Sequence, residues 1–441
     1  MNAPFRIPRH RQRRAARASS TRGAVLIVVL VICLGLVSLT LAFGHAMLLN
    51  YRGVDNELAG RQADLAIEGA ARYAEALMSN ATHPGDFPDH ASYQSSAVPV
   101  GEASFWFIGK PSSTDPQDQP YFGLVDEASK LNLNTASQTM LLNLPGMTQD
   151  LAAAIVAWRK SPSNATNTLM MSGATAVKYA PFESVEELAL VNGGTDPGIL
   201  YGDDANLNHV SDPQELSGGL GQFNPGLFEY VTVFSREPNT LSDGTKRTNV
   251  TGNVGALGSL LNTQLGAARA REVEARLRGG GIRSVLEFYL RSGLTADEFD
   301  KVTPYLTMQN GPYSVGLINV NTAGETVLAC VPGIGPDNAQ KIVAARTQQA
   351  QASTNLAWVA TILGRQAAIT AGPYLTTQSY QVSADVAAVG RHGRGYRRTR
   401  FVIDASAGTP QIVYRRNLAA LGWALGDSVR QTLANKKGAT P

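Results

Sequence analysis

The hydrophobic pattern of the chain begins with an abrupt change from basic to apolar sequence. Residues 1–23 contain seven arginines and no acidic residue, whereas residues 24–43 form a run of 20 residues without a charge. A run of this length suffices to cross a bilayer as a helix. Basic flanks stay on the cytoplasmic side of a membrane. The pattern therefore predicts a single span, with the rest of the chain on the far side.

Helical periodicity continues well beyond the apolar run. Apolar side chains recur at helical spacing as far as residue 78, and proline is absent from residues 24–78. They are Val54, Leu58, Leu65, Ile67, Ala70, Ala74 and Leu77. At 1.5 Å per residue we expect one helix of roughly 80 Å. Its first half is apolar all round, and its second half is amphipathic.

Strand-like segments occupy two separate parts of the chain. Aromatic or β-branched residues favour strands at 103–108 and 121–126, and again at 380–389, 398–405 and 411–415. The last three predict an antiparallel meander. Residues 134–375 between the two groups are mostly helical in pattern. We therefore predict an α+β fold, in which a long N-terminal helix accompanies an antiparallel sheet that a large all-α insertion interrupts.

This pattern gives five expected regions. Residues 1–23 form a basic leader, and residues 24–80 form the N-terminal transmembrane helix. Residues 81–133 and 376–441 supply the two parts of the sheet domain, and residues 134–375 form the helical insertion.

Two segments of the insertion, 131–160 and 318–348, resemble each other. Each has an Asn-Thr pair expected to cap a short apolar helix, then a Pro-Gly turn, and then a second helix. This is the helix-hairpin-helix pattern. The turns are Pro145 and Gly146 in the first segment, and Pro332, Gly333 and Gly335 in the second. Thr148 replaces the second glycine of the first turn.

Such hairpins bind DNA when their amides hold a phosphate and nearby basic residues offset its charge. Basic residues are few here. Lys341 and Arg346 follow the strong turn together with Asp337, and Arg159 and Lys160 follow the other with Asp150. We therefore favour a packing role for the hairpins, and nucleic acid is not an expected partner.

Between residues 202 and 215 the chain carries oxygen-bearing side chains at the spacing of an EF-hand loop. The expected calcium ligands are Asp204, Asn206, Asn208, the Val210 carbonyl, Asp212 and Glu215. His209 stands where this loop usually has glycine, at a position that needs a positive φ. An Asx-rich surface turn is the competing interpretation. Hard oxygen ligands argue against zinc.

The charge and the remaining motifs narrow the function further. The net charge of +3 comes from the leader, because removing its seven arginines leaves 31 basic against 35 acidic residues. Of the two cysteines, Cys33 lies in the apolar span and Cys330 in an apolar helix pattern, so we expect no disulfide. A second basic stretch, residues 391–437, is interpreted as a solvated face of the strands. The sequence lacks a Walker loop, GxSxG or HExxH motif, and we do not expect an enzyme.

The start of the chain has three interpretations. It is an ordinary anchor, a secretory peptide cut near Gly44-His45-Ala46, or a leader of the type IV pilin kind. A secretory peptide has a shorter apolar core. With Arg22 and Gly23 before Ala24, the junction resembles a prepilin, in which a prepilin peptidase cuts between Gly23 and Ala24. Pilin-like subunits usually carry Glu five residues after the cut, and this chain has Val28 there.

The leader, the long helix, the divided sheet, the NxNTA…PGxG hairpins and the oxygen-rich loop together resemble minor pseudopilin K of type II secretion systems, the general secretion pathway protein K family. The resemblance implies a subunit at the tip of a short pseudopilus that supports protein export. It implies other minor pseudopilins, the major pseudopilin and the inner-membrane secretion platform as partners, and calcium as the ligand. The implied location is the bacterial inner membrane, crossed once, with the N-terminus cytoplasmic before processing, the processed N-terminus methylated and the globular part in the periplasm. One alternative is a membrane-anchored, competence-type DNA receptor, which shares the INVNTA…PGIG hairpin. Another is a pilin-like adhesin or other surface component.

Overall fold

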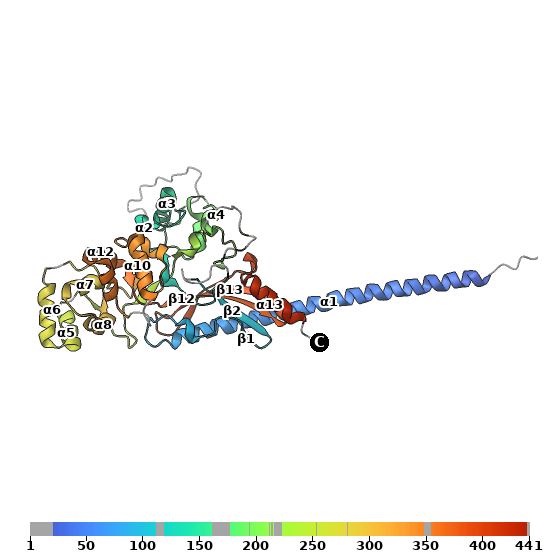
Figure 1. Cartoon of the computed structure of the whole chain (residues 1–441), viewed down its shortest axis with the longest axis horizontal. Helices are drawn as coiled ribbons and strands as arrows, with labels where there is room; N and C mark the ends of the chain where they lie inside the picture. The colour runs from blue at the N-terminus through green and yellow to red at the C-terminus, as the bar shows by residue number, and fades with distance from the viewer. Residues whose placement is uncertain are drawn as a thin grey trace, which may run out of the picture. The chain divides into compact units, whose positions relative to one another are not determined.

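A computed structural model gives the fold of the chain (Figure 1). It describes residues 21–111, 119–160, 177–193, 195–210, 212, 215, 223–252, 254–279, 281–347 and 354–438. Two compact units divide the chain, Met1–Leu58 and Ala59–Pro441. They are described separately below.

Helix α1, Thr21–Ser79, is a single helix of 59 residues that begins in the first unit. The large apolar side chains from Val25 to Phe43 are all exposed, each with more than half of its surface accessible. Among the described residues, α1 holds the one segment that is long and apolar enough to cross a membrane. The predicted long helix and its apolar first half are therefore confirmed.

The second unit is built on an antiparallel sheet whose main strands run in the order β1-β2-β12-β13-β14, with β3 also paired to β12. The strands are β1 (Val98–Val100), β2 (Ala103–Ile108), β3 (Val125–Asp126), β12 (Gln381–Gly390), β13 (Arg394–Asp404) and β14 (Gln411–Asn417). The expected meander at the end of the chain is confirmed. Strand β1 was not predicted, because three residues are too few to show a period.

The part of α1 that belongs to the second unit packs against one face of this sheet. Its inward side chains are small, with Ala63, Ala66 and Ala70 fully buried, so the helix lies close to Phe105 and Phe107 of β2. The β12–β13 turn comes closer still. A Cβ added to Gly390 would lie 2.0 Å from the Ala59 carbonyl oxygen, so only glycine fits there.

The opposite face of the sheet carries a second apolar cluster and the insertion. Trp106, Ile108 and Val389 pack there against Ala424 and Leu425. These last two residues precede helix α13, Gly426–Gly438, which was not predicted. The insertion itself runs from the end of β3 to the start of β12.

The insertion contains three repeats of one architecture. Each is closed by a parallel ladder of two residues, in which an Asn on the first strand is opposite a Thr on the last. The pairs are Asn132–Thr232 in the first repeat (residues 131–232), Asn249–Thr307 in the second (248–307) and Asn319–Thr376 in the third (318–376).

The elements of the repeats follow the same order. The first contains β4 (Leu131–Asn132), α2 (Gln138–Leu141), α3 (Gln149–Arg159), η3 (Val185–Gly193), α4 (Pro197–Tyr201), η4 (Leu227–Glu229) and β5 (Val231–Thr232). The second contains β7 (Thr248–Asn249), α5 (Val254–Leu265), α6 (Ala267–Leu277), α7 (Val285–Ser292), α8 (Ala296–Val302), η5 (Thr303–Tyr305) and β8 (Leu306–Thr307). The third contains β10 (Ile318–Asn319), α9 (Glu325–Ala329), α10 (Gly335–Thr347), α11 (Ala357–Leu363), α12 (Arg365–Ala371), η6 (Gly372–Tyr374) and β11 (Leu375–Thr376).

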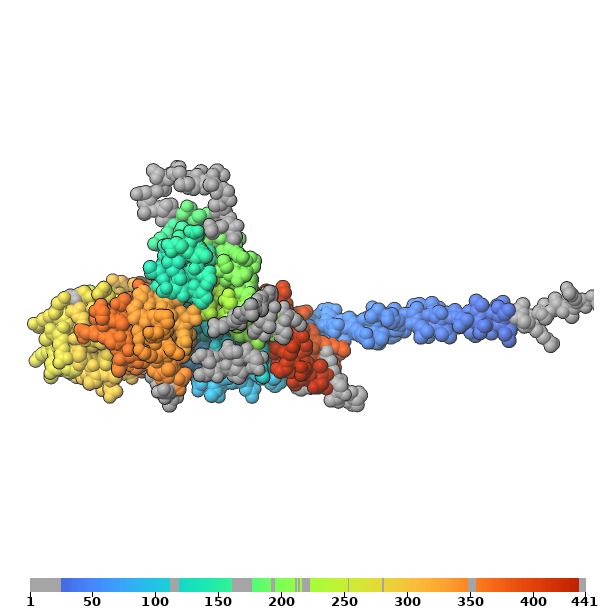
Figure 2. Space-filling view, turned by 45° about the horizontal axis from the view of Figure 1, so that its top comes forward, coloured from blue at the N-terminus to red at the C-terminus, as the bar shows by residue number. Residues whose placement is uncertain are grey.

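Two short strands connect the repeats, β6 (Arg236–Pro238) and β9 (Tyr313–Val315), which pair with each other. The first and third repeats share one core, which Leu286 of the second repeat joins. The second repeat forms most of another core, which Ala357 of the third repeat joins. Figure 2 shows the surface of the third repeat, in orange, next to that of the second, in yellow.

The expected Asn-Thr helix caps are wrong. Helix α2 is capped by Ser137, and α9 starts after Gly324 without a side-chain cap. The asparagines of the parallel ladders instead stabilise the turn that follows each strand. Their side-chain Oδ1 atom accepts the backbone N–H two residues later in Asn132, Asn249 and Asn319. Asparagine is therefore needed to turn the chain out of the strand, not to start the helix.

Candidate functional site

The oxygen-rich loop follows α4 in the first repeat, and its first half is largely buried. Asp204 is 1 % exposed and Asn208 is fully buried, so these two residues do not lie on the surface as the surface-turn interpretation expects. The Asp204 carboxylate accepts the backbone N–H of Asn208 and of His209, at 2.9 Å each. The loop therefore closes around its first acidic residue.

The backbone has the conformation expected at the sixth position of the loop. His209 has a φ of 64°, and Leu207 is also in the left-handed region, at 55°. Such angles cost energy in residues other than glycine. They persist here because the Asp204 carboxylate holds the following turn.

The later oxygen-bearing residues face the first ones. Glu215 accepts the Asn206 N–H at 3.0 Å, and the Asp212 carboxylate accepts the side-chain amides of Asn206 (2.8 Å) and Asn208 (3.1 Å). Val210 is buried beside them, with its N–H bonded to the Asn208 side chain. The Oδ1 of Asn206 is buried without a hydrogen-bond partner in the described part of the chain.

The electrostatics of this loop fit a cation. Burial raises the pKa of Asp204 and of Glu215 despite the backbone N–H groups that bond to these carboxylates. Among the described residues, no three His, Cys, Asp or Glu side chains converge on one point. A cation here would therefore also depend on the amide and carbonyl oxygens of Asn206, Asn208 and Val210, which suits calcium.

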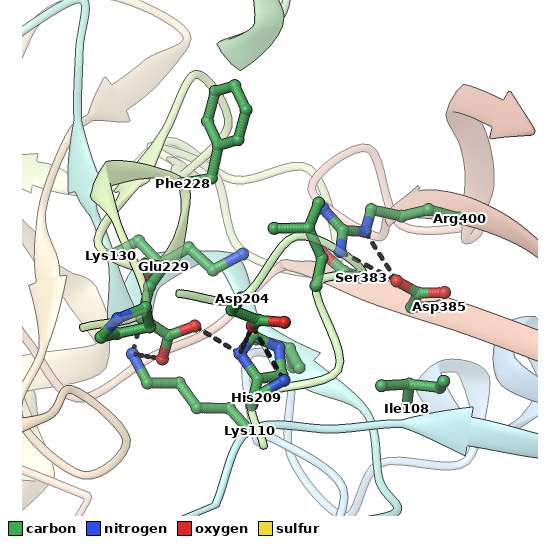
Figure 3. A pocket seen from close by; sticks show the side chains of 13 residues that line it. Ile108, Lys110, Lys130, Asp204, His209, Phe228, Glu229, Ser383, Asp385 and Arg400 are labelled. Carbon is green, nitrogen blue, oxygen red and sulfur yellow. Dashed lines mark hydrogen bonds and ion pairs between the residues drawn. The ribbon is translucent and has the colours of Figure 1, made fainter. Parts of the chain in front are cut away.

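A small cavity next to the loop is lined by charged side chains of both the sheet and the insertion (Figure 3). The Glu229 carboxylate lies 2.8 Å from Lys110 Nζ and 2.6 Å from His209 Nδ1. Burial by itself would raise the pKa of Glu229, but its contacts with His209 and Lys110 lower that pKa well below its usual value. The cavity, about 20 Å³, has room for about one water molecule and is too small for a substrate.

A second group of buried charges lies on the sheet beside this cavity. Asp385 of β12 accepts hydrogen bonds from Arg398 (2.8 and 2.9 Å) and Arg400 (2.8 and 3.1 Å) of β13. The two arginines lower its pKa to about 2 against the opposing effect of burial. Arg398 is fully buried, which corrects the interpretation of residues 391–437 as a solvated face for this residue, whereas Arg415 and Arg430 are exposed.

The hairpin turns adopt the tight conformations that their glycines permit. Gly146, Gly333 and Gly335, which follow Pro145 and Pro332, have φ of 71°, 89° and 68°. A Cβ at Gly333 would lie 2.8 Å from the Ala367 carbonyl oxygen of α12, so this turn packs against its own repeat. Thr148, in place of a glycine, caps α3 by accepting the Leu151 N–H.

The basic residue at the end of each predicted hairpin is used inside the fold. Arg159 donates to the carbonyls of Leu133 and Ala136, and Arg346 donates to those of Val320 and Ala323. The two arginines thus make equivalent bonds in the first and third repeats. Burial lowers the pKa of both guanidinium groups.

Two comparisons with known proteins bear on this chain. Residues 314–354 match the helix-hairpin-helix motif, which confirms the stronger of the two predicted hairpins. The chain is also similar to a chain of the GspK-GspI-GspJ complex of the type 2 secretion system from enterotoxigenic Escherichia coli. That similarity covers 83 % of this chain and 98 % of the other, with 10 % sequence identity and a TM-score of 0.34. No curated protein matches the sequence.

The predicted cleavage site lies at the start of α1. Gly23 and Ala24 fall within the helix, but their side chains and residues 1–20 are outside the described part of the chain. The cleavage therefore stays a prediction.

Sequence reasoning missed the charged residues that surround the loop, namely Lys110, Glu229, Asp385, Arg398 and Arg400. The only signal was the spacing of Arg398 and Arg400, which places both on one face of a strand. Their partner Asp385 is on a neighbouring strand, and its register could not be read from the sequence.

Proposed function

We propose that this protein is a minor pseudopilin of a type II secretion system, positioned at the tip of the pseudopilus. One observation carries the proposal. The second half of α1 packs into an antiparallel sheet, and a helical insertion of about 250 residues interrupts that sheet between β3 and β12.

Two features support the tip position. Subunits stacked within a thin fibre leave little room for an insertion of this size, whereas the end of a fibre does. Val28 removes the glutamate that would offset the free amine of a neighbouring subunit inside the membrane, where an unpaired charge is costly. A subunit without a neighbour beyond it does not need that glutamate. The role is one of assembly, not catalysis.

The use of the hairpin arginines argues against a DNA receptor. DNA binding through the hairpins would need basic side chains that are free to reach phosphates. Arg159 and Arg346 instead bond to backbone carbonyls of their own repeats.

Co-purification tests the proposal. When the full chain is expressed with the other pseudopilins of its own secretion system, we expect a stable complex in detergent. Isolation of the protein alone from such co-expression would contradict the proposal. In a mobility-shift assay, tight and salt-sensitive binding of duplex DNA would instead support the DNA receptor.

We further propose that the loop from Asp204 to Glu215 binds one calcium ion. Asp204, Asn206, Asn208, Asp212 and Glu215 would supply side-chain oxygens, and Val210 would supply its carbonyl oxygen. The buried, unpartnered Asn206 Oδ1 and the raised pKa of Asp204 support this ligand set. Calcium would neutralise the buried carboxylates and hold the loop in place.

Thermal unfolding with and without calcium tests the loop. At a calcium concentration 100 times the dissociation constant, we expect a gain of about 3 kcal/mol in the free energy of unfolding. The double variant Asp204→Ala with Glu215→Ala should lose that gain. Identical melting curves in calcium and in chelator would rule the site out.

A further inference from the structure

One buried arginine joins the oxygen-rich loop to the sheet. Arg398 of β13 has no exposed surface, and its guanidinium divides its donors between two partners. Nε and Nη2 bond to the two carboxylate oxygens of Asp385. Nη1 donates to the Asn206 carbonyl, and Nη2 donates to the Leu207 carbonyl at 2.7 Å.

The two carbonyls belong to the centre of the loop. They lie between the side chains of Asn206 and Asn208, both of which we assign as calcium ligands. Leu207 has a φ in the left-handed region, so the orientation of its carbonyl needs support from outside the loop. The Asn206 side-chain amide also donates to the Trp423 carbonyl at 3.3 Å.

Two guanidinium groups, those of Arg398 and Arg400, bond to Asp385, although one would neutralise its single carboxylate. Arg400 donates to the same carboxylate through Nε and Nη2, at 3.1 and 2.8 Å. Burying a second guanidinium costs free energy unless its donors are satisfied. The loop carbonyls satisfy two of the three remaining N–H donors of Arg398, so its position is explained by the loop and not by Asp385 alone.

We propose that Arg398 is a positioning residue for the calcium loop. It fixes the Asn206 and Leu207 peptides in the arrangement that brings the neighbouring side-chain oxygens together, and it makes calcium binding depend on the docking of the insertion against the sheet. This inference rests on the calcium binding proposed above. Arginine is required because its planar fork reaches two carbonyls and a carboxylate at once, which the ammonium of lysine does not.

The test compares Arg398→Lys with Arg400→Lys in the full chain in detergent. Both substitutions alter the same buried cluster, but the hydrogen bonds of Arg400 within the described residues go to Asp385 alone. By titration calorimetry with calcium chloride, we expect Arg398→Lys to weaken calcium binding at least about tenfold, as is usual for groups that orient ligands. Arg400→Lys should stay within about threefold of the wild type, well under that range. Equal affinities in the wild type and Arg398→Lys, or equal losses in both variants, would overturn the proposal.

Hydrogen exchange in chelator tests, without metal, the clamp that the hydrogen bonds of Arg398 form on the Asn206 and Leu207 carbonyls. Amides of residues 206–210 should exchange faster in Arg398→Lys than in Arg400→Lys, while the amides of β12 remain protected in both. Unchanged exchange in the loop would overturn the clamp. If the wild type binds no calcium, the calcium proposal fails and the metal link fails with it, while faster loop exchange in Arg398→Lys would still establish the clamp. Should Arg398→Lys not fold, Arg398→Gln keeps one amide donor and leaves Asp385 paired with Arg400.

Discussion

At the scale of single residues, Asp126 shows how the insertion is attached to the sheet. It is the last residue of β3 and is 2 % exposed. Its buried carboxylate accepts four hydrogen bonds. The donors are the Ala128 N–H and the side chains of Asn319, Thr322 and Ser379. Two of them belong to the third repeat. Burial raises the pKa of Asp126 to about 6 despite these bonds.

This pKa predicts a specific dependence of stability on pH. The carboxyl of Asp126 binds its proton more tightly in the folded chain than in the unfolded one, where its pKa is about 3.8. Its contribution to the free energy of unfolding therefore increases as the pH falls from 7 through 6 towards 4. We expect the wild type to gain about 2–3 kcal/mol over Asp126→Asn in that interval, measured by denaturant unfolding at several pH values.

A control separates this effect from general charge loss. Asp297 is exposed on α8, and Asp297→Asn removes one carboxylate from the surface without touching the buried contacts of Asp126. If the difference for Asp126→Asn changes with pH no more than the difference for Asp297→Asn does, the predicted role of Asp126 is wrong.

Single residues were predictable where their spacing was local. The loop oxygens and the positive φ at His209 follow from a twelve-residue pattern, and the structure brings those residues together. Arg398 was not predictable as a buried residue, because its partners Asn206 and Asp385 are distant in sequence or on another strand.

At the scale of elements, the first and third repeats each have an arginine that closes the hairpin. Arg346 lies at the end of α10 and donates to two carbonyls of the turn before α9. Arg346→Met keeps the apolar stem but leaves those carbonyls without a partner. We expect a loss of about 2 kcal/mol in the free energy of unfolding. Lys341→Met on the exposed side of the same helix should change it by less than about 0.5 kcal/mol.

Denaturant unfolding of the two variants distinguishes this role from one in DNA binding. Similar small effects of both substitutions would show that the Arg346 bonds do not stabilise the repeat. A protein that used this hairpin on DNA would also lose binding in Lys341→Met, and we expect no binding to lose.

Helices and strands were predictable when they were long or were bounded by recognisable turn residues such as Pro-Gly. Helix α1 and the strands β12, β13 and β14 were found because their periods extend over many residues. The hairpin of the second repeat was missed, because it has only Gly266 in place of a Pro-Gly turn. Its signal was present in the order Asn249, Gly266, Ala270 and Val273, which follows that of Asn319, Gly335, Ala339 and Ile342.

At the scale of the whole molecule, the division into a sheet domain and a helical insertion was predictable, but the contacts between the two were not. An α+β fold with a divided sheet follows from two groups of strand patterns separated by helical sequence. The contacts between the sheet and the insertion are polar. The residues that make them, or lie next to them, are Asp126, Glu229, Asp385 and Arg398. Such contacts depend on three-dimensional register, so they appear only in the structure.

Processing at Gly23 affects the whole chain, because it decides whether α1 begins with a basic segment or as an apolar helix. Removal of residues 1–23 takes away seven arginines and reverses the sign of the net charge. We expect Gly23→Ala to keep the leader attached in a strain with prepilin peptidase, since the peptidase needs glycine before the cut. The control is Gly35→Ala in the same helix, where a Cβ would meet nothing within 4 Å, and it should be processed normally. Intact-mass spectrometry measures both, and a wild-type protein that retains Met1 would show that α1 serves as an uncut anchor.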